Sequence, residues 1–201
     1  TGGYRVIDAL TTLAFDYPKR SPFFTKELEA FLLLTREENM DPFDATGSYA
    51  GAMGSPQFMP SSYRAYAVDA SGDNKRDIWN NWSDVIGSVA NYFVRHGWQQ
   101  GKEIIVPANL ESLSELPVIK TDLKATETVL QLREAGIKFS TTMNDDHPSK
   151  LLFLEQEDAH DYWVGFHNFF VITRYNHSTM YALAVHQLGQ EISAEIVNAN
   201  E

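Results

Sequence analysis

The stretch Gly47-Ser-Tyr-Ala-Gly-Ala-Met-Gly-Ser-Pro-Gln-Phe-Met-Pro-Ser-Ser62 is the most informative part of this 201-residue sequence. It combines three glycines, two prolines and four serines with two methionines, two aromatic residues and one glutamine. Glycine lets a ligand or another backbone segment approach closely and adopts dihedral angles that other residues avoid. A mostly apolar loop with a few polar groups is typical of a ligand cleft, and a tight buried connection between helices has the same composition. The residues alone leave both interpretations open.

Composition narrows the class of protein. Hydrophobic residues make up 43% and charged residues 21% of the chain, which is typical of a globular domain. Sixteen Lys and Arg against 27 Asp and Glu give a formal charge of -11, and no basic cluster is present, so nucleic acid and anionic membrane surfaces are disfavoured as partners. The absence of cysteine excludes disulfides, and the six histidines lack zinc-site spacing and are interpreted as surface or packing residues. The sequence contains no run of 18 apolar residues, so it does not predict a membrane-spanning helix.

Apolar residues recur at helical spacing through the first hundred residues, beginning with Val6, Leu10 and Leu13. Ser21-Pro22 predicts a helix cap followed by proline at the first helical position. The helices of this half are predicted to begin near Val6, at Ser21-Pro22, after Pro60, and near Asn81 or Ser83, with the last one ending at Gly97.

From Gly101 the pattern changes to short runs of β-branched and aromatic residues, with one helical piece at about 125–135. Helical periodicity returns after Asn176 and is predicted to stop at Gly189. The expected fold class is α+β, mainly α: a helical core over 1–100, a β-rich insertion over 101–170, and a return to the core over 171–201. The predicted strands are 103–107, 116–120, 137–140, 150–155, 162–166 and 168–174.

A second motif places oxygen-bearing side chains at alternate positions just after the glycine-rich stretch. The run Asp69-Ala-Ser71-Gly-Asp73-Asn-Lys75-Arg-Asp77 has the 1, 3, 5, 9 spacing of a calcium loop, in which position 7 contributes a backbone carbonyl. That assignment gives Asp69, Ser71, Asp73 and the Lys75 carbonyl as predicted metal ligands. An acidic, solvated turn would have the same spacing.

Two positions depart from the calcium-loop pattern. Asn74 stands where an EF-hand has glycine, although asparagine tolerates the left-handed conformation. Position 12 is Asn80 rather than a bidentate glutamate, and Asp84 is predicted to fold back and supply the missing carboxylate.

The Gly47–Ser62 stretch resembles the GSYAGAMGxxQFMPSS signature of the membrane-bound lytic transglycosylase B family, which cleaves bacterial peptidoglycan. Phe15-Asp-Tyr-Pro-Lys-Arg20, Ser88-Val-Ala-Asn-Tyr92-Phe and Ile172–Tyr181 resemble further elements of that family, so the resemblance runs from residue 4 to about 190. It implies a lysozyme-like helical core and, directly after the signature, an EF-hand-like loop with calcium as a structural cofactor. It also implies a periplasmic protein, with an outer-membrane lipid anchor in an N-terminal segment not present here.

The resemblance implies that glycan strands of peptidoglycan are the partner. Lys19 stands where the family has an arginine. Lysine keeps the positive charge but lacks the planar guanidinium that can form two parallel hydrogen bonds to a carboxylate. Tyr92 and Tyr181 also fit plain packing roles, because both fall on or near predicted apolar stripes. The residues that the resemblance implies for the glycan cleft are Arg20, Ser48, Gln57, Tyr92, Tyr175, Asn176 and Tyr181.

The implied reaction breaks the β-1,4 bond between N-acetylmuramic acid and N-acetylglucosamine and forms 1,6-anhydromuramic acid. It needs one glutamic acid, as general acid and then base. In the family this glutamate precedes the helix that holds Arg5-Val-Ile-Asp-Ala-Leu10, so it is expected upstream of Thr1 and no catalytic residue is expected in this chain. Glu37 and Glu38 are interpreted as solvated surface acids.

The chain, which lacks an initiator methionine, is therefore expected to be a fragment or a processed product, inactive alone, whose partner is a separate N-terminal segment of the same protein. Removal of that segment is expected to expose Val6 and Leu10. A non-catalytic peptidoglycan-binding fragment and a hydrolytic muramidase remain open as alternative functions.

Overall fold

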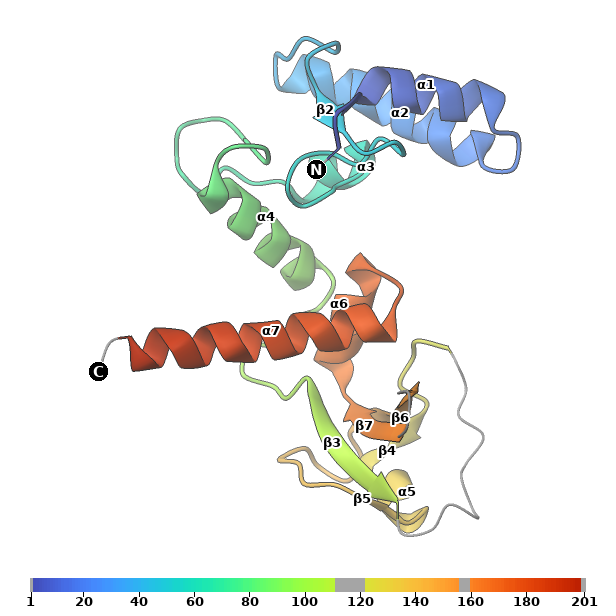
Figure 1. Ribbon diagram of the computed structural model, residues 1–201, viewed down its shortest axis with the longest axis vertical. Helices are drawn as coiled ribbons and strands as arrows, with labels where there is room; N and C mark the ends of the chain where they lie inside the picture. The colour runs from blue at the N-terminus through green and yellow to red at the C-terminus, as the bar shows by residue number, and fades with distance from the viewer. Residues whose placement is uncertain (1, 111–121, 156–159, 200–201) are drawn as a thin grey trace. The chain divides into compact units, whose positions relative to one another are not determined.

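The computed structural model describes residues 2–110, 122–155 and 160–199 (Figure 1). The chain divides into two compact units, Thr1–Arg95 and His96–Glu201. Within the described residues, no helix is both long and apolar enough to cross a membrane. Helices outweigh strands in the described residues, so the predicted α+β, mainly helical class is confirmed.

The first unit is built from helices and one short antiparallel pairing. Strand β1 (Tyr4–Arg5) pairs with β2 (Thr46–Gly47) and thereby joins the chain before the first helix to the start of the glycine-rich loop. Helices α1 and α2 lie side by side, and α2 also packs against α3 (Figure 1). The helices of this unit are α1 (Val6–Asp16), α2 (Ser21–Glu37), α3 (Pro60–Tyr66) and α4 (Trp82–Arg95).

Helix α1 buries Val6, Leu10 and Ala14, one turn apart along a single face. The expectation that Val6 and Leu10 would be exposed is wrong, because both are 0% exposed. The glycine-rich loop lies over this face: a Cβ added at Gly51 would sit 2.5 Å from Leu10 Cδ2, and Gly51 has φ of +81°. Glycine at 51 therefore serves both a left-handed turn and a close approach.

The predicted helix starts are close to the observed ones, but the capping differs at α2. Ser21 is the first residue of α2 rather than its cap, and its hydroxyl donates to the Ala14 carbonyl at 2.5 Å. Pro22 does lie in the first turn, as predicted. Before α4, Asn81 Oδ1 accepts the Ser83 N–H at 3.0 Å, so Asn81 is the cap of the two predicted alternatives, Asn81 and Ser83.

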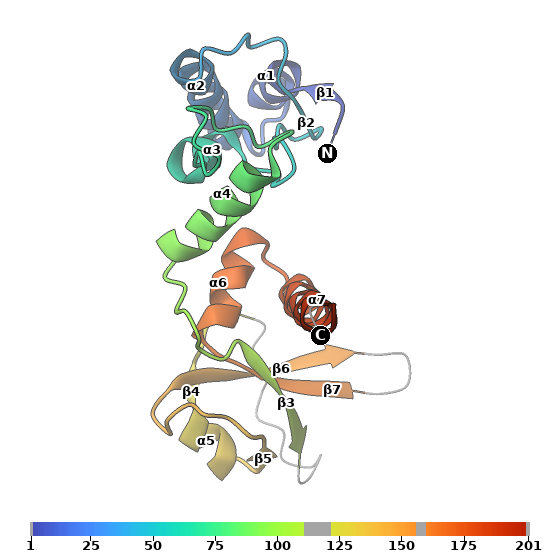
Figure 2. The same ribbon diagram turned by 90° about the vertical axis from the view of Figure 1, so that its left-hand side faces the viewer.

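The second unit contains a five-stranded antiparallel sheet with the order β4-β6-β7-β3-β5. Helices α6 and α7 lie on one side of the sheet, and α5 lies on the other (Figure 2). The strands are β3 (Ile105–Leu110), β4 (Glu127–Thr128), β5 (Ile137–Lys138), β6 (Pro148–Glu155) and β7 (His160–Gly165), and the helices are α5 (Val129–Glu134), α6 (His167–Tyr175) and α7 (Thr179–Asn198).

Two hydrophobic clusters cover the two faces of this sheet, as the alternation of side chains along strands requires. Leu151 and Val164 belong to the cluster that contains α5, whereas Leu152 and Leu154 belong to the cluster that contains α6 and α7. Residues 167–198 are thus packed within the second unit. The predicted return of residues 171–201 to the core of 1–100, like the boundaries at 100 and 170, stays a prediction.

The segment predicted as a strand at 168–174 is a helix, α6. Phe169 and Ile172 are buried three residues apart on its inner face, so a helical period fits this short apolar run better than alternation. The predicted end of the last helix at Gly189 is also wrong, because α7 continues to Asn198. A glycine in the middle of a helix costs only about 1 kcal/mol relative to alanine, and the flanking residues are good helix formers. The predicted strand at 116–120 lies outside the described residues.

Candidate glycan-binding loop and metal centre

Ser48 organises the first turn of the glycine-rich loop. Its backbone N–H donates to the Ala52 carbonyl at 2.8 Å, and its own carbonyl accepts the Gly51 N–H at 2.9 Å. Its side-chain Oγ accepts the N–H groups of Ala50 at 3.2 Å and Ala52 at 3.1 Å. Both lone pairs of the hydroxyl are used within the loop, which leaves its O–H as the group able to donate to a ligand.

Gln57 occupies a second tight turn, closed by paired hydrogen bonds between the backbones of Met53 and Phe58. It is a non-glycine residue with φ of +55°, and its amide Nε2 donates to the Gly54 carbonyl at 2.8 Å. Gly54 itself has φ of +62°, and a Cβ there would lie 2.5 Å from the Ile78 carbonyl oxygen. Strained backbone at non-glycine residues costs about 1–3 kcal/mol and clusters at functional sites. The side chain of Gln57 is exposed.

Tyr92 supports this loop from α4. It is 9% exposed, and its ring lies 4.8 Å from that of Tyr66 and 6.0 Å from that of Phe58, measured between centroids. The structure thus brings Tyr92 against the loop that carries Gln57. Arg20 directly precedes α2, is exposed, and stacks its guanidinium on Phe23 of that helix, 4.6 Å from the ring centroid.

The remaining predicted glycan residues lie in the second unit, around the turn from α6 to α7. Tyr175 ends α6, and the exposed Asn176 follows it, with its carbonyl accepting the Ser178 N–H at 2.7 Å. Tyr181 lies in the first turn of α7 and packs on the cluster that contains Ala182, and its burial raises the pKa of its phenol. The ligand roles of these three residues stay predictions.

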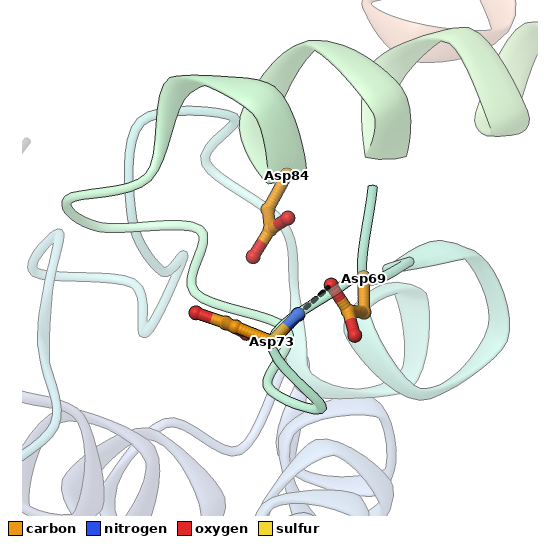
Figure 3. A group of neighbouring side chains, drawn as sticks. All are labelled: Asp69, Asp73 and Asp84. Atoms are coloured by element: carbon orange, nitrogen blue, oxygen red, sulfur yellow. Dashed lines mark hydrogen bonds between the residues drawn. The ribbon is translucent and has the colours of Figure 1, made fainter. Parts of the chain in front are cut away.

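Asp69, Asp73 and Asp84 converge, as the calcium-loop spacing predicts (Figure 3). Each offers one carboxylate oxygen, and these oxygens lie within 4.8 Å of one another. Asp84 is 0% exposed in the first turn of α4 and accepts N–H groups from Ala70 at 2.9 Å, Ser71 at 3.0 Å and Asp77 at 2.9 Å. The predicted fold-back of Asp84 onto the loop is therefore found.

Asp69 holds the other side of the loop. Its carboxylate accepts the N–H groups of Gly72 at 2.6 Å and Asn74 at 2.7 Å, and the Ser71 hydroxyl at 3.2 Å. Desolvation raises the pKa of Asp69, but these hydrogen bonds outweigh it and keep the pKa below its usual value. Asn74 has φ of +65°, the left-handed conformation that its EF-hand position requires.

The donor chemistry of this cluster fits a hard divalent cation, which prefers several carboxylate and carbonyl oxygens. Ser71 donates its N–H to Asp84 at 3.0 Å and its hydroxyl to Asp69 at 3.2 Å, and its role as a metal ligand stays a prediction. The Lys75 N–H donates to Asp73 Oδ1 at 2.9 Å, and the role of the Lys75 carbonyl as a ligand stays a prediction.

Glu27 is a supporting residue that the sequence analysis missed. It is 5% exposed on α2, and its carboxylate accepts the Ser61 N–H at 2.9 Å and the Ser61 hydroxyl at 2.7 Å. It thereby fixes the start of α3, directly after the glycine-rich loop. The available signal was its place between Phe24 and Phe31, three and four residues away on the buried face of α2.

Comparison with known proteins agrees with these features. Residues 1–190 match the Transglycosylase SLT domain. The chain is 47% identical over 192 residues to the membrane-bound lytic murein transglycosylase B of Escherichia coli (strain K12), covering 96% of this chain and 52% of the relative. It thus spans about half the length of that curated relative.

Two solved structures share the fold. The Escherichia coli lytic transglycosylase Slt35, in complex with calcium, is 46% identical with a TM-score of 0.86, covering 98% of this chain and 61% of that chain. SltB3 from Pseudomonas aeruginosa, in complex with NAG-anhNAM-pentapeptide, is 31% identical with a TM-score of 0.77, covering 92% of this chain and 49% of that chain. With the domain match extending over residues 1–190, the chain belongs to the transglycosylase SLT domain family.

Proposed function

We propose that this chain is part of a peptidoglycan lytic transglycosylase. The enzyme cleaves the β-1,4 bond between N-acetylmuramic acid and N-acetylglucosamine, and the muramic 6-hydroxyl attacks C1 to give the 1,6-anhydro product. The observation that carries the proposal is the Gly47–Ser62 loop, where the exposed Gln57 is held in a left-handed conformation in a chain of this family. Backbone strain at an exposed polar residue is expected where a side chain must point at a ligand.

Within the first unit, Ser48 and Gln57 are proposed to donate hydrogen bonds to the glycan. Arg20 is proposed to supply a cation beside the same glycan strand. Tyr92 positions the glycine-rich loop through its ring contact with Phe58. Within the second unit, Tyr175, Asn176 and Tyr181 are proposed to contact sugar from the turn between α6 and α7.

The general acid is proposed to come from residues that precede Thr1. The reaction needs a carboxyl whose pKa is raised by an apolar cleft. Glu37 is the opposite case, because its hydrogen bond to Arg64 lowers its pKa despite desolvation. Glu38 is ion-paired with Arg76, and Glu27 is occupied by Ser61. Glu38 is also less exposed than the sequence suggested, with 15% of its side chain accessible.

Calcium is proposed as a structural ion held by Asp69, Ser71, Asp73, the Lys75 carbonyl and Asp84. The support is the convergence of three carboxylates and the left-handed Asn74. Bound calcium would neutralise charges that otherwise repel one another. It would thereby fasten the 69–84 segment to the first turn of α4, and it takes no part in bond cleavage.

The proposed site of action is the periplasm, with attachment to the outer membrane through an N-terminal lipid. The support is the name of the Escherichia coli relative, a membrane-bound lytic murein transglycosylase. The glycan strands of peptidoglycan are the proposed partner.

The decisive experiment is mass spectrometry of the soluble products released from peptidoglycan sacculi. The intact gene product should release anhydro-muropeptides. A polypeptide made of residues 1–201 should bind sacculi but release no anhydro-muropeptides. Reducing-end products would indicate a hydrolytic muramidase instead. Robust anhydro-muropeptide release by residues 1–201 would show that the acid lies within this chain and would refute its placement upstream.

A further inference from the structure

A cavity of about 300 Å³ lies within the second unit, whereas the residues proposed above as metal ligands belong to the first unit. One wall is a single face of α6, formed by His167, Phe170, Val171 and Arg174, which recur at helical spacing. The other walls come from residues 96–99, 123–125 and 147–148. Four separate segments of the unit thus meet at this cavity.

The lining of the cavity is strongly biased in charge. It contains three histidines (His96, His147 and His167) together with Lys124 and Arg174, and none of its lining residues is acidic. The chain as a whole carries a formal charge of -11. A pocket whose ionisable lining residues are all basic, on so acidic a chain, favours an anionic ligand.

His147 adds an independent sign of a missing partner. Its backbone is fixed, because its N–H donates to Asn144 and its carbonyl accepts from Val129. Its ring packs on Phe166, with the centroids 5.9 Å apart. Nevertheless, its Nε2 atom is buried and has no hydrogen-bond partner. A buried polar atom without a partner costs free energy that a ligand in the cavity would recover.

The arrangement does not suit a metal ion. Among the described residues, the aspartate group 69, 73 and 84 is the sole cluster whose ligand atoms approach closely enough for a shared metal. His167 Nε2 lies 2.8 Å from the Gly97 carbonyl, which can only accept, so this nitrogen carries a proton. Lys124 and Arg174 would also repel a cation in the same cavity.

We propose that this cavity binds a carboxylate of the peptide stem of peptidoglycan, an inference that rests on the proposed function. Arg174 directly precedes Tyr175, one of the residues proposed to contact the glycan, so a peptide branching from the strand would reach the cavity from there. A volume of about 300 Å³ is at the lower limit for small-molecule sites. A cavity of this size suits the carboxylate end of one amino-acid residue rather than a whole peptide. Arg174, Lys124 and the imidazole of His147 would hold the carboxylate oxygens.

The test is isothermal titration of the 201-residue chain with the tripeptide L-alanyl-γ-D-glutamyl-meso-diaminopimelate. The same peptide with its carboxylates amidated and inorganic phosphate are titrated in parallel. The carboxylate form should bind at least tenfold more tightly than the amidated form. The double variant Lys124→Ala, Arg174→Ala should weaken its binding at least tenfold, whereas Lys138→Ala, which removes a charge outside the cavity, should not change it.

Equal binding of the two peptides, no effect of the double variant, or binding of phosphate alone would overturn the proposal. If the double variant melts well below the native chain, Lys124→Gln replaces it, because Lys124 is exposed and its loss leaves the core intact. A failure of the proposed function is distinguished with the intact gene product and sacculi stripped of their peptides. Absence of anhydro products from untreated, stem-bearing sacculi would refute the activity, whereas equal release from untreated and stripped sacculi would refute only the pocket.

Discussion

Glu27 on α2 and Ser61 at the start of α3 are joined by two hydrogen bonds across the sequence. Ser61 donates its N–H to Glu27 Oε2 at 2.9 Å and its hydroxyl to Oε1 at 2.7 Å. The carboxylate therefore does for α3 what an N-cap side chain does, and it faces the positive end of that short helix. The glycine-rich loop ends directly at this helix, so Glu27 fixes one end of the loop.

Glu27→Ala is expected to lower the free energy of unfolding by about 1–3 kcal/mol, because it removes two charged hydrogen bonds and leaves a void on α2. Glu29→Ala is the matched control, since Glu29 is exposed on the same helix and should cost less than about 0.5 kcal/mol. Urea unfolding followed by tryptophan fluorescence measures both. Equal losses in the two variants would contradict the supporting role of Glu27.

Gly51→Ala is expected to destabilise the chain by about 2–5 kcal/mol, because the left-handed strain adds to the cost of a new methyl group 2.5 Å from Leu10 Cδ2. Gly72 provides a control for the backbone alone. It has φ of +80°, close to the +81° of Gly51, but a Cβ there would meet nothing within 4 Å. Gly72→Ala should therefore show only the left-handed strain, about 1–2 kcal/mol. If Gly51→Ala unfolds at the same urea concentration as Gly72→Ala, the loop does not pack on α1 as described.

Glu37 should make stability depend on pH. Both of its carboxylate oxygens accept hydrogen bonds from Arg64, at 2.7 to 3.1 Å, and the hydrogen bond to Arg64 lowers its pKa from 4.5 against the opposing effect of desolvation. A carboxylate whose pKa is lower in the folded state stabilises the fold above its unfolded pKa and loses this effect as the pH falls through the folded value. Glu37→Gln should therefore lower the urea midpoint at neutral pH, with the difference disappearing as the pH falls below the lowered pKa of Glu37. A difference that persists unchanged in acid would show that the ion pair is not its cause.

Calcium should raise the melting temperature of the chain, and a chelator should lower it again. A ligand that binds only the folded state adds about 2.7 kcal/mol at a hundredfold excess over its Kd. Asp73→Asn should remove most of this shift while changing the calcium-free melting temperature little, because Asp73 is exposed. Asp84→Asn is a poorer test, since Asp84 also holds three backbone N–H groups of the loop.

The control for calcium is Asp146→Asn, which removes an exposed carboxylate from the other unit. It should leave the calcium-dependent shift intact. A shift that survives in Asp73→Asn, or that is absent from the native chain, would leave the 69–84 segment as a solvated acidic turn.

Local signals predicted much of this structure from the sequence. Spacing alone placed Asp69 and Asp73 together, and Asp84 was correctly expected to fold back on them, because the intervening residues form a tight turn that ends at α4. The helix start at Pro60 and the Asn81 cap followed from residue preferences at helix ends.

Features that depend on tertiary packing were not predictable in the same way. Residues 168–174 have the composition of a strand, and burial of Phe169 and Ile172 against the sheet selects a helix instead. On α4 the apolar Ile86 is exposed, while the polar Asp84 and Ser88 are buried. The buried face is shifted because these two polar residues bind the backbone of the 69–84 segment and of Val68. Because these hydrogen-bond partners lie outside α4, the hydrophobic periodicity of the helix does not predict that Asp84 and Ser88 are buried.

Gln57 offers the sharpest separation of stability from function. Replacement by alanine keeps the strained φ of +55° and removes the hydrogen bond from Nε2 to Gly54. Replacement by glycine removes the same hydrogen bond but relieves the left-handed strain. Gln57→Gly should therefore be more stable than Gln57→Ala by about 1 kcal/mol.

If the Gln57 amide contacts the glycan, both variants of the intact gene product should lose turnover to the same degree. The expected fall in kcat/KM for anhydro-muropeptide release is at least about tenfold, equivalent to about 1.4 kcal/mol of lost transition-state stabilisation. The comparison decides between two roles because both variants lose the amide, whereas only Gln57→Gly relieves the backbone strain. If turnover instead follows stability, with Gln57→Gly close to the native enzyme and Gln57→Ala impaired, then Gln57 serves only to shape the loop and another residue contacts the sugar.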